Sequence, residues 1–301
     1  MWVLTGLCRL MRYEGQIYRP PSEAKSLILQ ATIGCSHNKC TFCVMYKDKK
    51  YRERSLEDIR ADIQEAKRVL GDVRRVFLAD GNALAMEQTK LMSVLRELSQ
   101  AFPSLERVGI YANPGDLLGK SVSQLRELKE AGIGIVYLGV ETGNDKILEQ
   151  VRKDATAAEI IQAGRRAKDS GIPLSVTVIN GLGGYELMKE HAADTAKLLN
   201  EMDPDYLGLL TLMVAPGTPI ARQMERGEFQ LPGPMEILAE IEMMLEPLEL
   251  TNCVFRSNHA SNYLPLGGVL PRDKEQIMQG LRSVLDKADM GKLRPEQFRG
   301  L

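Results

Sequence analysis

Apolar runs of strand length alternate along this chain with segments of helical periodicity, and this alternation restricts the fold more than any other feature. The six runs are Ser26 to Ile33, Arg75 to Ala79, Arg107 to Ala112, Ile133 to Val140, Pro173 to Ile179 and Tyr206 to Leu212. Strands that are each followed by a helix form a parallel sheet, because a right-handed crossover returns the chain in the same direction. The sequence therefore predicts an α/β fold in which six such units form an open, partial barrel.

Start and stop signals bound several of the expected helices. Ser55 to Asp58 is similar to a capping box and begins a helix that Gly71 ends. Further helices are predicted at Ser123 to Ala131 and at Ala157 to Ser170, each followed by a glycine.

Three segments are expected from this pattern. Residues 1–25 form a short N-terminal extension, residues 26–220 form the partial barrel, and residues 221–301 form a mostly helical region that caps the barrel. Within the last segment, helices are predicted at Pro234 to Leu250 and Lys274 to Met290, and a seventh strand at Asn252 to Arg256.

Composition narrows the class of protein. With 301 residues, 44% of them hydrophobic and 26% charged, the chain is long enough for one large globular domain. A net charge of -1 does not favour nucleic acid as a partner. No apolar run approaches the length of a membrane span of about 18 residues, so no membrane insertion is expected and the cytoplasm is the predicted location.

Cysteine usage indicates a reducing compartment. The five cysteines are an odd number and three of them are clustered, which does not suit a disulfide framework. Cys8 and Cys253 stand alone and are expected to be small buried apolar residues. The basic run from Lys47 to Arg54 is interpreted as a solvated segment, with attraction of an anionic substrate or an acidic electron donor as the alternative.

The three clustered cysteines, Cys35, Cys40 and Cys43, directly follow the first apolar run. Thiolate sulfur prefers zinc, copper(I) or iron-sulfur clusters to hard cations, so this loop predicts a metal site. Three sulfurs leave a tetrahedral site or a cubane one ligand short, and no second CxxC pair exists to supply the fourth. His37 is awkwardly spaced to complete the same site. The residues alone leave zinc and an iron-sulfur cluster equally open.

Polar or glycine-rich turns follow the other five apolar runs, at the edge of a parallel sheet where ligands bind. They are Asp80-Gly81-Asn82, Tyr111-Ala112-Asn113, Glu141-Thr142-Gly143, Asn180 to Gly184 and Met213 to Gly217. Any one of them alone is as readily an ordinary turn. Their recurrence beside a cysteine loop predicts a ligand site at this edge.

The spacing Cys35-x4-Cys40-x2-Cys43, with the aromatic Phe42 before the last cysteine, resembles the radical SAM superfamily. Most members have three residues between the first two cysteines, whereas this chain has four. The resemblance, over about residues 26–220, implies a [4Fe-4S] cluster on three cysteines whose fourth iron is chelated by S-adenosylmethionine. An electron from the cluster then yields methionine and a 5'-deoxyadenosyl radical. The overall pattern is most similar to the branch with oxygen-independent coproporphyrinogen oxidase and the elongator-type catalytic subunit.

The resemblance also implies cofactor contacts at the strand ends. Asp80-Gly81-Asn82 takes the place of the family's GGE motif, and Glu141 that of a glutamate that contacts the ribose or amino group. Glu141 in an ion pair with Arg152, Lys153 or Arg165 is the structural alternative. The expected cofactor-binding residues are Phe42, Asp80, Gly81, Asn82, Asn113, Glu141, Arg152, Arg165, Asn180, Gly181 and Val214.

Substrate residues are expected in a polar loop from Arg256 to Gly268, because loops over the mouth of a barrel carry specificity. His259 as a proton donor or acceptor, Arg256 as an anion clamp and Tyr111 are the catalytic candidates, with a structural polar network as the alternative. His191, in a polar helical stretch, is expected at the surface.

The function that these expectations favour is a radical SAM enzyme that acts on an unidentified small-molecule substrate. A reduced flavodoxin or a ferredoxin-type protein is the expected electron donor. The alternatives are a carrier of a cofactor such as haem without turnover, a radical-type methyltransferase, and a zinc-stabilised α/β protein.

Overall fold

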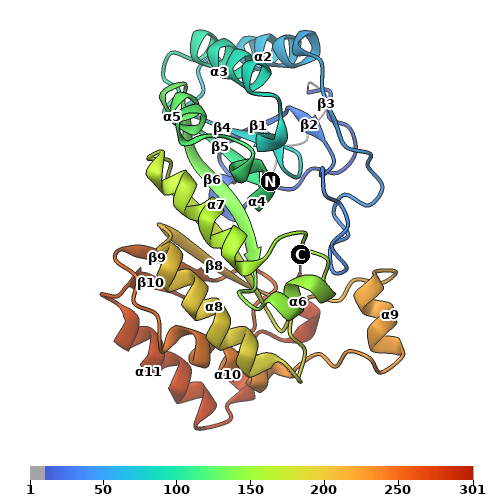
Figure 1. The fold of residues 1–301 in the computed structure, drawn as a ribbon, viewed down its shortest axis with the longest axis vertical. Helices are drawn as coiled ribbons and strands as arrows, with labels where there is room; N and C mark the ends of the chain where they lie inside the picture. The colour runs from blue at the N-terminus through green and yellow to red at the C-terminus, as the bar shows by residue number, and fades with distance from the viewer. Residues whose placement is uncertain (1–10, 301) are drawn as a thin grey trace. The chain divides into compact units, whose positions relative to one another are not determined.

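The structure, a computed structural model, describes residues 11–300 (Figure 1). The chain divides into two compact units. The first contains the described residues up to Asn38 together with Met45–Leu138 and Arg166–Pro173. The second contains Lys39–Val44, Gly139–Arg165 and the described residues from Leu174 onwards. Cys8 lies outside the described residues, and the predicted boundaries after residues 25 and 220 stay a prediction.

The first unit is built on four parallel strands in the order β1, β4, β5 and β6. They are β1 (Leu27–Gln30), β4 (Arg75–Ala79), β5 (Arg107–Ala112) and β6 (Ile133–Glu141), whose last three residues belong to the second unit. The short strands β2 (Thr32–Ile33) and β3 (Arg52–Glu53) pair antiparallel. The run predicted from Ser26 to Ile33 therefore breaks into β1 and β2, which belong to different sheets.

The helices of the first unit are α2 (Leu56–Leu70), α3 (Gln88–Ala101), α4 (Pro114–Leu118) and α5 (Val122–Glu130), with one-turn helices η1 (Pro21–Glu23) and η2 (Ala83–Ala85). Helix α2 begins and ends at the predicted residues. The Ser55 hydroxyl accepts from the Asp58 N–H at 3.1 Å, and Gly71 adopts a φ of 74° after the last turn. In Figure 1, α2 and α3 lie side by side.

The second unit contains β7 (Leu174–Asn180), β8 (Tyr206–Thr211) and β9 (Cys253–Ser257) as parallel neighbours, with β10 (Leu266–Leu270) antiparallel to β9. Its helices are α6 (Asp145–Gln150), α8 (Met188–Met202), α9 (Pro219–Glu225), α10 (Pro234–Leu245) and α11 (Lys274–Leu285), with η3 (Met290–Lys292) and η4 (Glu296–Phe298). Helix α7 (Ala157–Asp169) begins in this unit and ends in the first.

The predicted α/β class is confirmed, because strands alternate with helices and neighbouring strands are mostly parallel. The prediction of a loop from Arg256 to Gly268 is wrong at both ends. Arg256 lies in β9, and the two glycines 267 and 268 lie in β10. A Cβ on Gly268 would come within 2.8 Å of the Asp273 Cβ, so close packing accounts for a glycine here.

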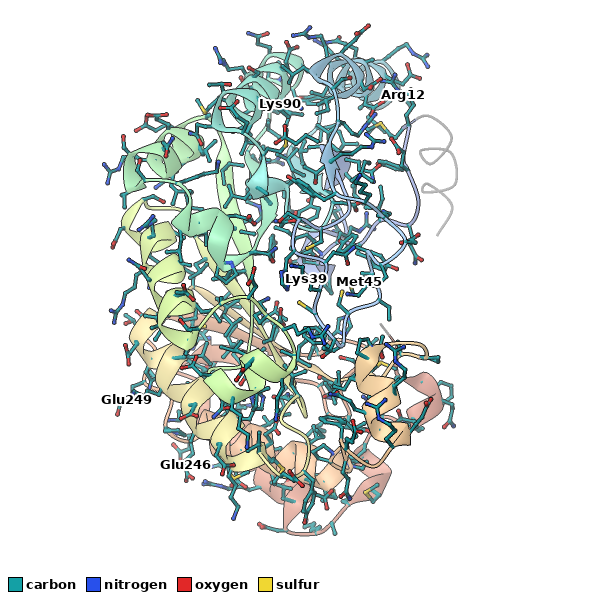
Figure 2. The ribbon with its side chains drawn as sticks, turned by 45° about the vertical axis from the view of Figure 1, so that its right-hand side comes forward. Arg12, Lys39, Met45, Lys90, Glu246 and Glu249 are labelled. Carbon is teal, nitrogen blue, oxygen red and sulfur yellow. The ribbon has the colours of Figure 1, made fainter. Side chains whose placement is uncertain are left out.

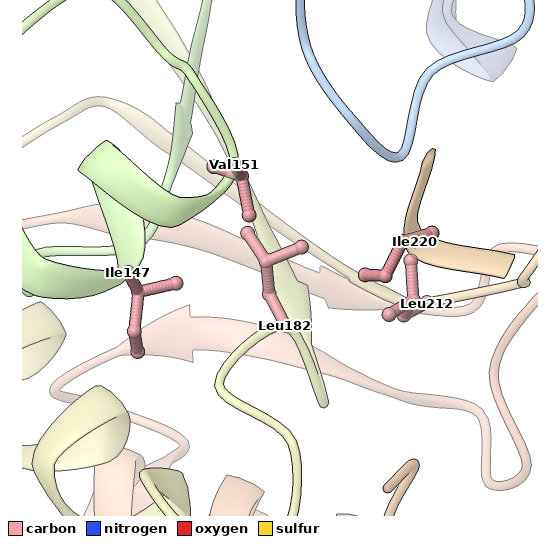
Figure 3. Close-up of a cluster of buried hydrophobic side chains, with 5 residues drawn as sticks. All are labelled: Ile147, Val151, Leu182, Leu212 and Ile220. Atoms are coloured by element: carbon pink, nitrogen blue, oxygen red, sulfur yellow. The ribbon is translucent and has the colours of Figure 1, made fainter. Parts of the chain in front are cut away.

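Each unit has its own apolar core. In the first, the rings of Phe77, Tyr111 and Tyr137 meet edge to face on neighbouring strands. In the second, Ile147, Val151, Leu182, Leu212 and Ile220 form a buried cluster at the strand ends (Figure 3). Among the helices of residues 11–300, none has the length and apolar character that crossing a membrane requires.

A buried ion pair fixes α2 to β1 in the first unit. The Arg54 guanidinium donates to Asp62 at 2.6 Å and to the backbone carbonyl of Gln30 at 2.8 Å, and both charged side chains are almost fully buried. Arg12, labelled in Figure 2, adds a more exposed contact to the same carboxylate at 2.8 Å. Removal of one partner from such a pair leaves a buried charge without compensation.

We therefore expect Asp62→Leu to lower the free energy of unfolding by about 3 kcal/mol, because Arg54 remains buried and unpaired. Denaturant unfolding followed by circular dichroism measures this loss. The matched control is Glu65→Leu on the same helix, which removes an exposed contact to Arg68 and is expected to change stability little. Equal losses in the two variants would contradict the argument from burial.

Candidate functional site

The turn after β4 holds the first part of the cysteine loop. The Asp80 carboxylate is fully buried, and its Oδ2 accepts from Lys49 Nζ at 2.8 Å, from Gln30 at 3.0 Å and from the Gly34 N–H at 3.1 Å. Gly34 directly precedes Cys35. Asp80 therefore fixes the backbone at the entrance of the loop.

Asn82 supports the next step of the same loop. Its Oδ1 accepts from the Ser36 N–H at 2.8 Å, and its amide group donates to the Ser36 hydroxyl at 2.6 Å and to Asp116 at 2.9 Å. Between the two side chains, the Gly81 N–H donates to the Gly34 carbonyl at 3.1 Å. A Cβ at Gly81 would lie only 2.7 Å from the Cys35 Cβ, so only glycine fits this approach.

The turn after β5 reaches Cys35 as well. The Asn113 amide lies 3.7 Å from the Cys35 sulfur, and the Asn113 N–H donates to Asp116 at 2.7 Å. Asn113 therefore holds the side chain of Cys35 from a second strand end. Cys35 is half-buried, and its role as a metal ligand stays a prediction.

The second part of the cysteine loop, Lys39–Val44, belongs to the second unit (Figure 2 labels Lys39 and Met45 at its limits). The Thr41 N–H donates to the carbonyl of Val151 at 3.0 Å, and its carbonyl accepts from the Ile220 N–H at 3.3 Å. Phe42 packs against the buried cluster of Figure 3, as does Val214. Cys40 and Cys43 are half-buried on either side of these contacts.

Glu141, at the end of β6, is nearly buried and forms an ion pair with Lys153 at 2.8 Å. The structural alternative for Glu141 is thus present. Its backbone has a φ of 65°, a left-handed conformation that costs free energy for any residue with a side chain and is concentrated at ligand sites. Arg152 is exposed with a φ of 56°, whereas Arg165 donates to the backbone carbonyl of Glu201 on α8 at 2.9 Å.

The turn after β7 carries Asn180 and Gly181. Asn180 is fully buried, and neither atom of its amide group has a partner among the described residues. The Gly181 N–H donates to Glu240 of α10 at 2.8 Å, and Gly181 has a φ of 80°. A buried polar side chain without a protein partner is costly, so Asn180 fits a position that faces a bound molecule.

The prediction of His191 at the surface is wrong. His191 is fully buried on α8, where its Nδ1 lies 2.7 Å from the Thr142 hydroxyl and its Nε2 lies 3.5 Å from Glu240 Oε1. The Thr142 hydroxyl also accepts from the Asn144 N–H at 3.1 Å, and the His191 Nε2 has no hydrogen-bond partner among the described residues.

Burial shifts both titrating groups of this pair toward their neutral forms. Burial lowers the pKa of His191 to about 4, and the backbone carbonyl of Ile179 offsets part of this shift. Burial raises the pKa of Glu240 to about 8, and the hydrogen bond from the Gly181 N–H offsets part of that shift. At neutral pH the pair is therefore an imidazole beside a protonated carboxyl group.

The catalytic candidates have partners of their own. His259 accepts from the Ser261 N–H at 3.1 Å. Burial lowers the pKa of His259, and the positive charge of the nearby Arg294 lowers it further. Arg256 is exposed on β9, and its guanidinium donates to the carbonyl of Phe255 at 2.9 Å. Burial raises the pKa of Tyr111 well above its usual range, so this phenol stays protonated. Their catalytic roles stay a prediction.

The donor set fits an iron-sulfur cluster by its chemistry, because three half-buried cysteines on one short loop supply soft ligands and leave one iron open. Among residues 11–300, no three His, Cys, Asp or Glu side chains already stand together as a metal site. The assignment of Cys35, Cys40 and Cys43 therefore rests on their residue type and spacing.

Sequence reasoning missed Lys49, Thr195 and Glu240. Lys49 was part of a basic run interpreted as solvated, yet it is buried against Asp80. Glu240 stands between Ile237 and Ile241, which are buried at helical spacing, so the apolar period of α10 contained the signal.

Since the raised pKa of Glu240 means that the folded protein keeps a proton that the unfolded chain releases, its stabilising effect is complete below about pH 4.5 and is lost as pH rises toward about 8. We expect the thermal midpoint of the wild type to fall relative to that of Glu240→Gln as pH increases from about 5 to about 8.5. The corresponding loss in the free energy of unfolding is at most about 1.4 kcal/mol per pH unit. Differential scanning fluorimetry across pH checks this. A constant gap between the two proteins would contradict a protonated Glu240.

Comparison with known proteins gives the family. The profile of the radical SAM superfamily matches residues 29–199. The heme chaperone HemW of Bacillus subtilis (strain 168) is 30% identical over 184 residues, which are 59% of this chain and 47% of HemW. The tRNA-2-methylthio-N(6)-dimethylallyladenosine synthase of Shewanella sp. (strain W3-18-1) is 28% identical over 213 residues, which are 67% of this chain and 44% of the synthase. The chain thus spans less than half the length of these two relatives.

Solved structures agree on the fold. Coproporphyrinogen III oxidase (HemN) from Escherichia coli superposes with a TM-score of 0.55 at 20% identity, over 80% of this chain and 55% of that protein. Methylornithine synthase (PylB) superposes with a TM-score of 0.52 at 17% identity, over 75% of this chain and 63% of that protein. At these identities the likeness concerns the fold alone, which is the predicted partial barrel. Because the family profile covers more than half of its residues, this chain belongs to the radical SAM superfamily, whose members use a [4Fe-4S] cluster and S-adenosylmethionine.

Proposed function

We propose that this protein is an enzyme that cleaves S-adenosylmethionine reductively at a [4Fe-4S] cluster held by Cys35, Cys40 and Cys43. The observation that carries the proposal is the support of the cysteine loop by the β4 turn, in which Asp80 and Asn82 hold the Gly34 and Ser36 backbone. When bound, the cluster supplies the electron that converts S-adenosylmethionine into methionine and a 5'-deoxyadenosyl radical. A small organic molecule is the proposed substrate.

The chain's own residues have distinct roles in this proposal. The Asn82 side chain and Asp80 Oδ2 are bonded within the protein, so the cofactor contacts of this turn fall to its backbone carbonyls and to Asp80 Oδ1, which has no partner among the described residues. Glu141 with Lys153 offers a carboxylate for the ribose hydroxyls and an ammonium for the cofactor carboxylate. Asn180 provides a buried polar side chain for the adenosyl group, and the neighbouring Gly181 fixes the turn through its bond to Glu240.

The electron source in this proposal is a reduced flavodoxin or ferredoxin. Lys47 and Lys50 are exposed in the segment that follows the cysteine loop. Exposed lysines attract acidic partners over about a Debye length, which favours the encounter with a negatively charged electron carrier.

Removal of any one loop cysteine tests the metal assignment. We expect Cys35→Ala, Cys40→Ala and Cys43→Ala each to abolish the cluster, because two thiolates cannot retain a cubane. Iron and sulfide content after anaerobic reconstitution, with electron paramagnetic resonance of the reduced sample, measure this. Cys253→Ala, at a buried position in β9, is the control and should keep full iron content. A normal cluster in Cys40→Ala would contradict the assignment, and a colourless wild type that contains zinc would replace it.

Turnover is tested by product formation. The reconstituted wild type with S-adenosylmethionine and dithionite should form 5'-deoxyadenosine and methionine in equal amounts, and Cys43→Ala should form neither. Liquid chromatography with mass spectrometry detects both products. If the cluster-loaded wild type forms no 5'-deoxyadenosine while S-adenosylmethionine alters its resonance signal, the protein binds the cofactor without cleaving it.

A haem carrier is the second candidate, supported by the 30% identity to the heme chaperone HemW. Titration of the cluster-loaded protein with haemin, followed by the Soret band, distinguishes the two functions. Stoichiometric haem binding without deoxyadenosine formation would favour the carrier, whereas turnover without a Soret shift would exclude it.

A further inference from the structure

The turn after β6 lies directly on helix α8. The Gly143 N–H donates to the Thr195 hydroxyl at 2.8 Å, and the Asn144 amide donates to Asp194 at 2.6 Å. A Cβ on Gly143 would come within 2.3 Å of the Asp194 carbonyl oxygen, so the turn approaches the helix as closely as a backbone can. Helix α8 therefore fixes the position of this turn through direct contacts.

The turn after β7 is held in the same way by α10. Glu240 accepts from the Gly181 N–H at 2.8 Å, and a Cβ on Gly181 would lie 2.8 Å from the Ile237 Cδ1 on the same helix. Because Gly181 has a left-handed φ, its N–H is turned out of the ladder between β7 and β8. Glu240 accepts from it instead.

His191 joins the two supports. Its ring lies between the Thr142 hydroxyl at 2.7 Å and Glu240 Oε1 at 3.5 Å, with the Thr195 hydroxyl at 3.4 Å from the same Nδ1. All four side chains are fully buried. Two turns that are separate in sequence are thus held by neighbouring buried polar groups, and the His191 Nε2 that faces Glu240 has no hydrogen-bond partner among the described residues.

A hydrophobic core alone would not require this network. Apolar residues of similar volume pack α8 and α10 at the neighbouring positions, and they avoid the cost of burying a titrating pair. What apolar residues cannot do is accept a hydrogen bond from the N–H of Gly143 or Gly181. The polar residues therefore specify the conformation of the turns, which both lie at ligand-facing ends of strands.

We propose that Thr195, His191 and Glu240 are positioning residues that set the affinity for S-adenosylmethionine by fixing the turns after β6 and β7. This inference rests on the proposed cofactor site. The three residues hold the turns, and Glu141 and Asn180 on those turns present the contacts to the cofactor.

The test measures the dissociation constant of S-adenosylmethionine for cluster-loaded protein by equilibrium dialysis without reductant, together with iron content. Glu240→Leu and Thr195→Val each remove an acceptor and are expected to weaken binding about tenfold at unchanged iron content. Glu240→Gln keeps an acceptor for the Gly181 N–H and should restore the affinity to within about twofold of wild type. Glu242→Leu, on another face of α10 where it removes a contact to Arg282, is the control and should bind normally.

The outcomes separate the two proposals. A wild type that holds its cluster and binds no S-adenosylmethionine would overturn the proposed function and this inference with it. A wild type that binds, with unchanged affinity in both Thr195→Val and Glu240→Leu, would overturn the inference alone. A parallel loss of affinity, iron and thermal midpoint that glutamine does not rescue would show a purely structural role. If Glu240→Leu fails to fold, the nearly isosteric Thr195→Val still decides.

Discussion

The cysteine loop depends on one buried carboxylate. Asp80 directly follows β4, and its Oδ2 accepts hydrogen bonds from the Lys49 ammonium, the Gln30 side-chain amide and the Gly34 N–H, all from the first unit. An isolated charge in this position would be too costly to bury, so Lys49 is as necessary as Asp80 itself. Together they fix Gly34, and through it the direction in which Cys35 leaves the strand.

The same arrangement recurs at the other strand ends. Side-chain oxygens accept from the backbone N–H groups of Ser36, Asn113, Gly143 and Gly181. Turns at the carboxyl edge of a parallel sheet leave such N–H groups without a partner strand, and burial makes them costly unless a side chain supplies an oxygen. Polar side chains at these strand ends therefore bind backbone N–H groups of the turns. Asn82, where the family motif has a glutamate, has its side-chain oxygen and amide group hydrogen-bonded within the protein.

The strands could be predicted because β-branched runs of four to nine residues have few other stable conformations, and Ser55 marked the start of α2. Helix α5 was predicted from Ser123, whereas it begins at Val122 with Ser121 as its N-cap. The burial of residues that support the site could not be predicted from the charge of their neighbours in the sequence. His191 follows Lys189 and Glu190, so the local sequence looks solvated, yet its spacing to Thr195, Leu198 and Met202 places it on the buried face of α8. The helical periodicity indicated the burial of His191 correctly, whereas the polarity of its neighbours indicated exposure.

Buried titrating groups are compensated in two ways. Lys49 with Asp80 and Arg54 with Asp62 in the first unit, like Lys153 with Glu141 in the second, are ion pairs in which each partner compensates the other. For His191 and Glu240, burial lowers the pKa of the first and raises that of the second, so this pair has no net charge at neutral pH. A neutral pair imposes no strong field on the turns it holds. It can therefore fix the Gly181 turn without favouring or repelling the positive sulfonium that the proposed cofactor brings to this edge of the sheet.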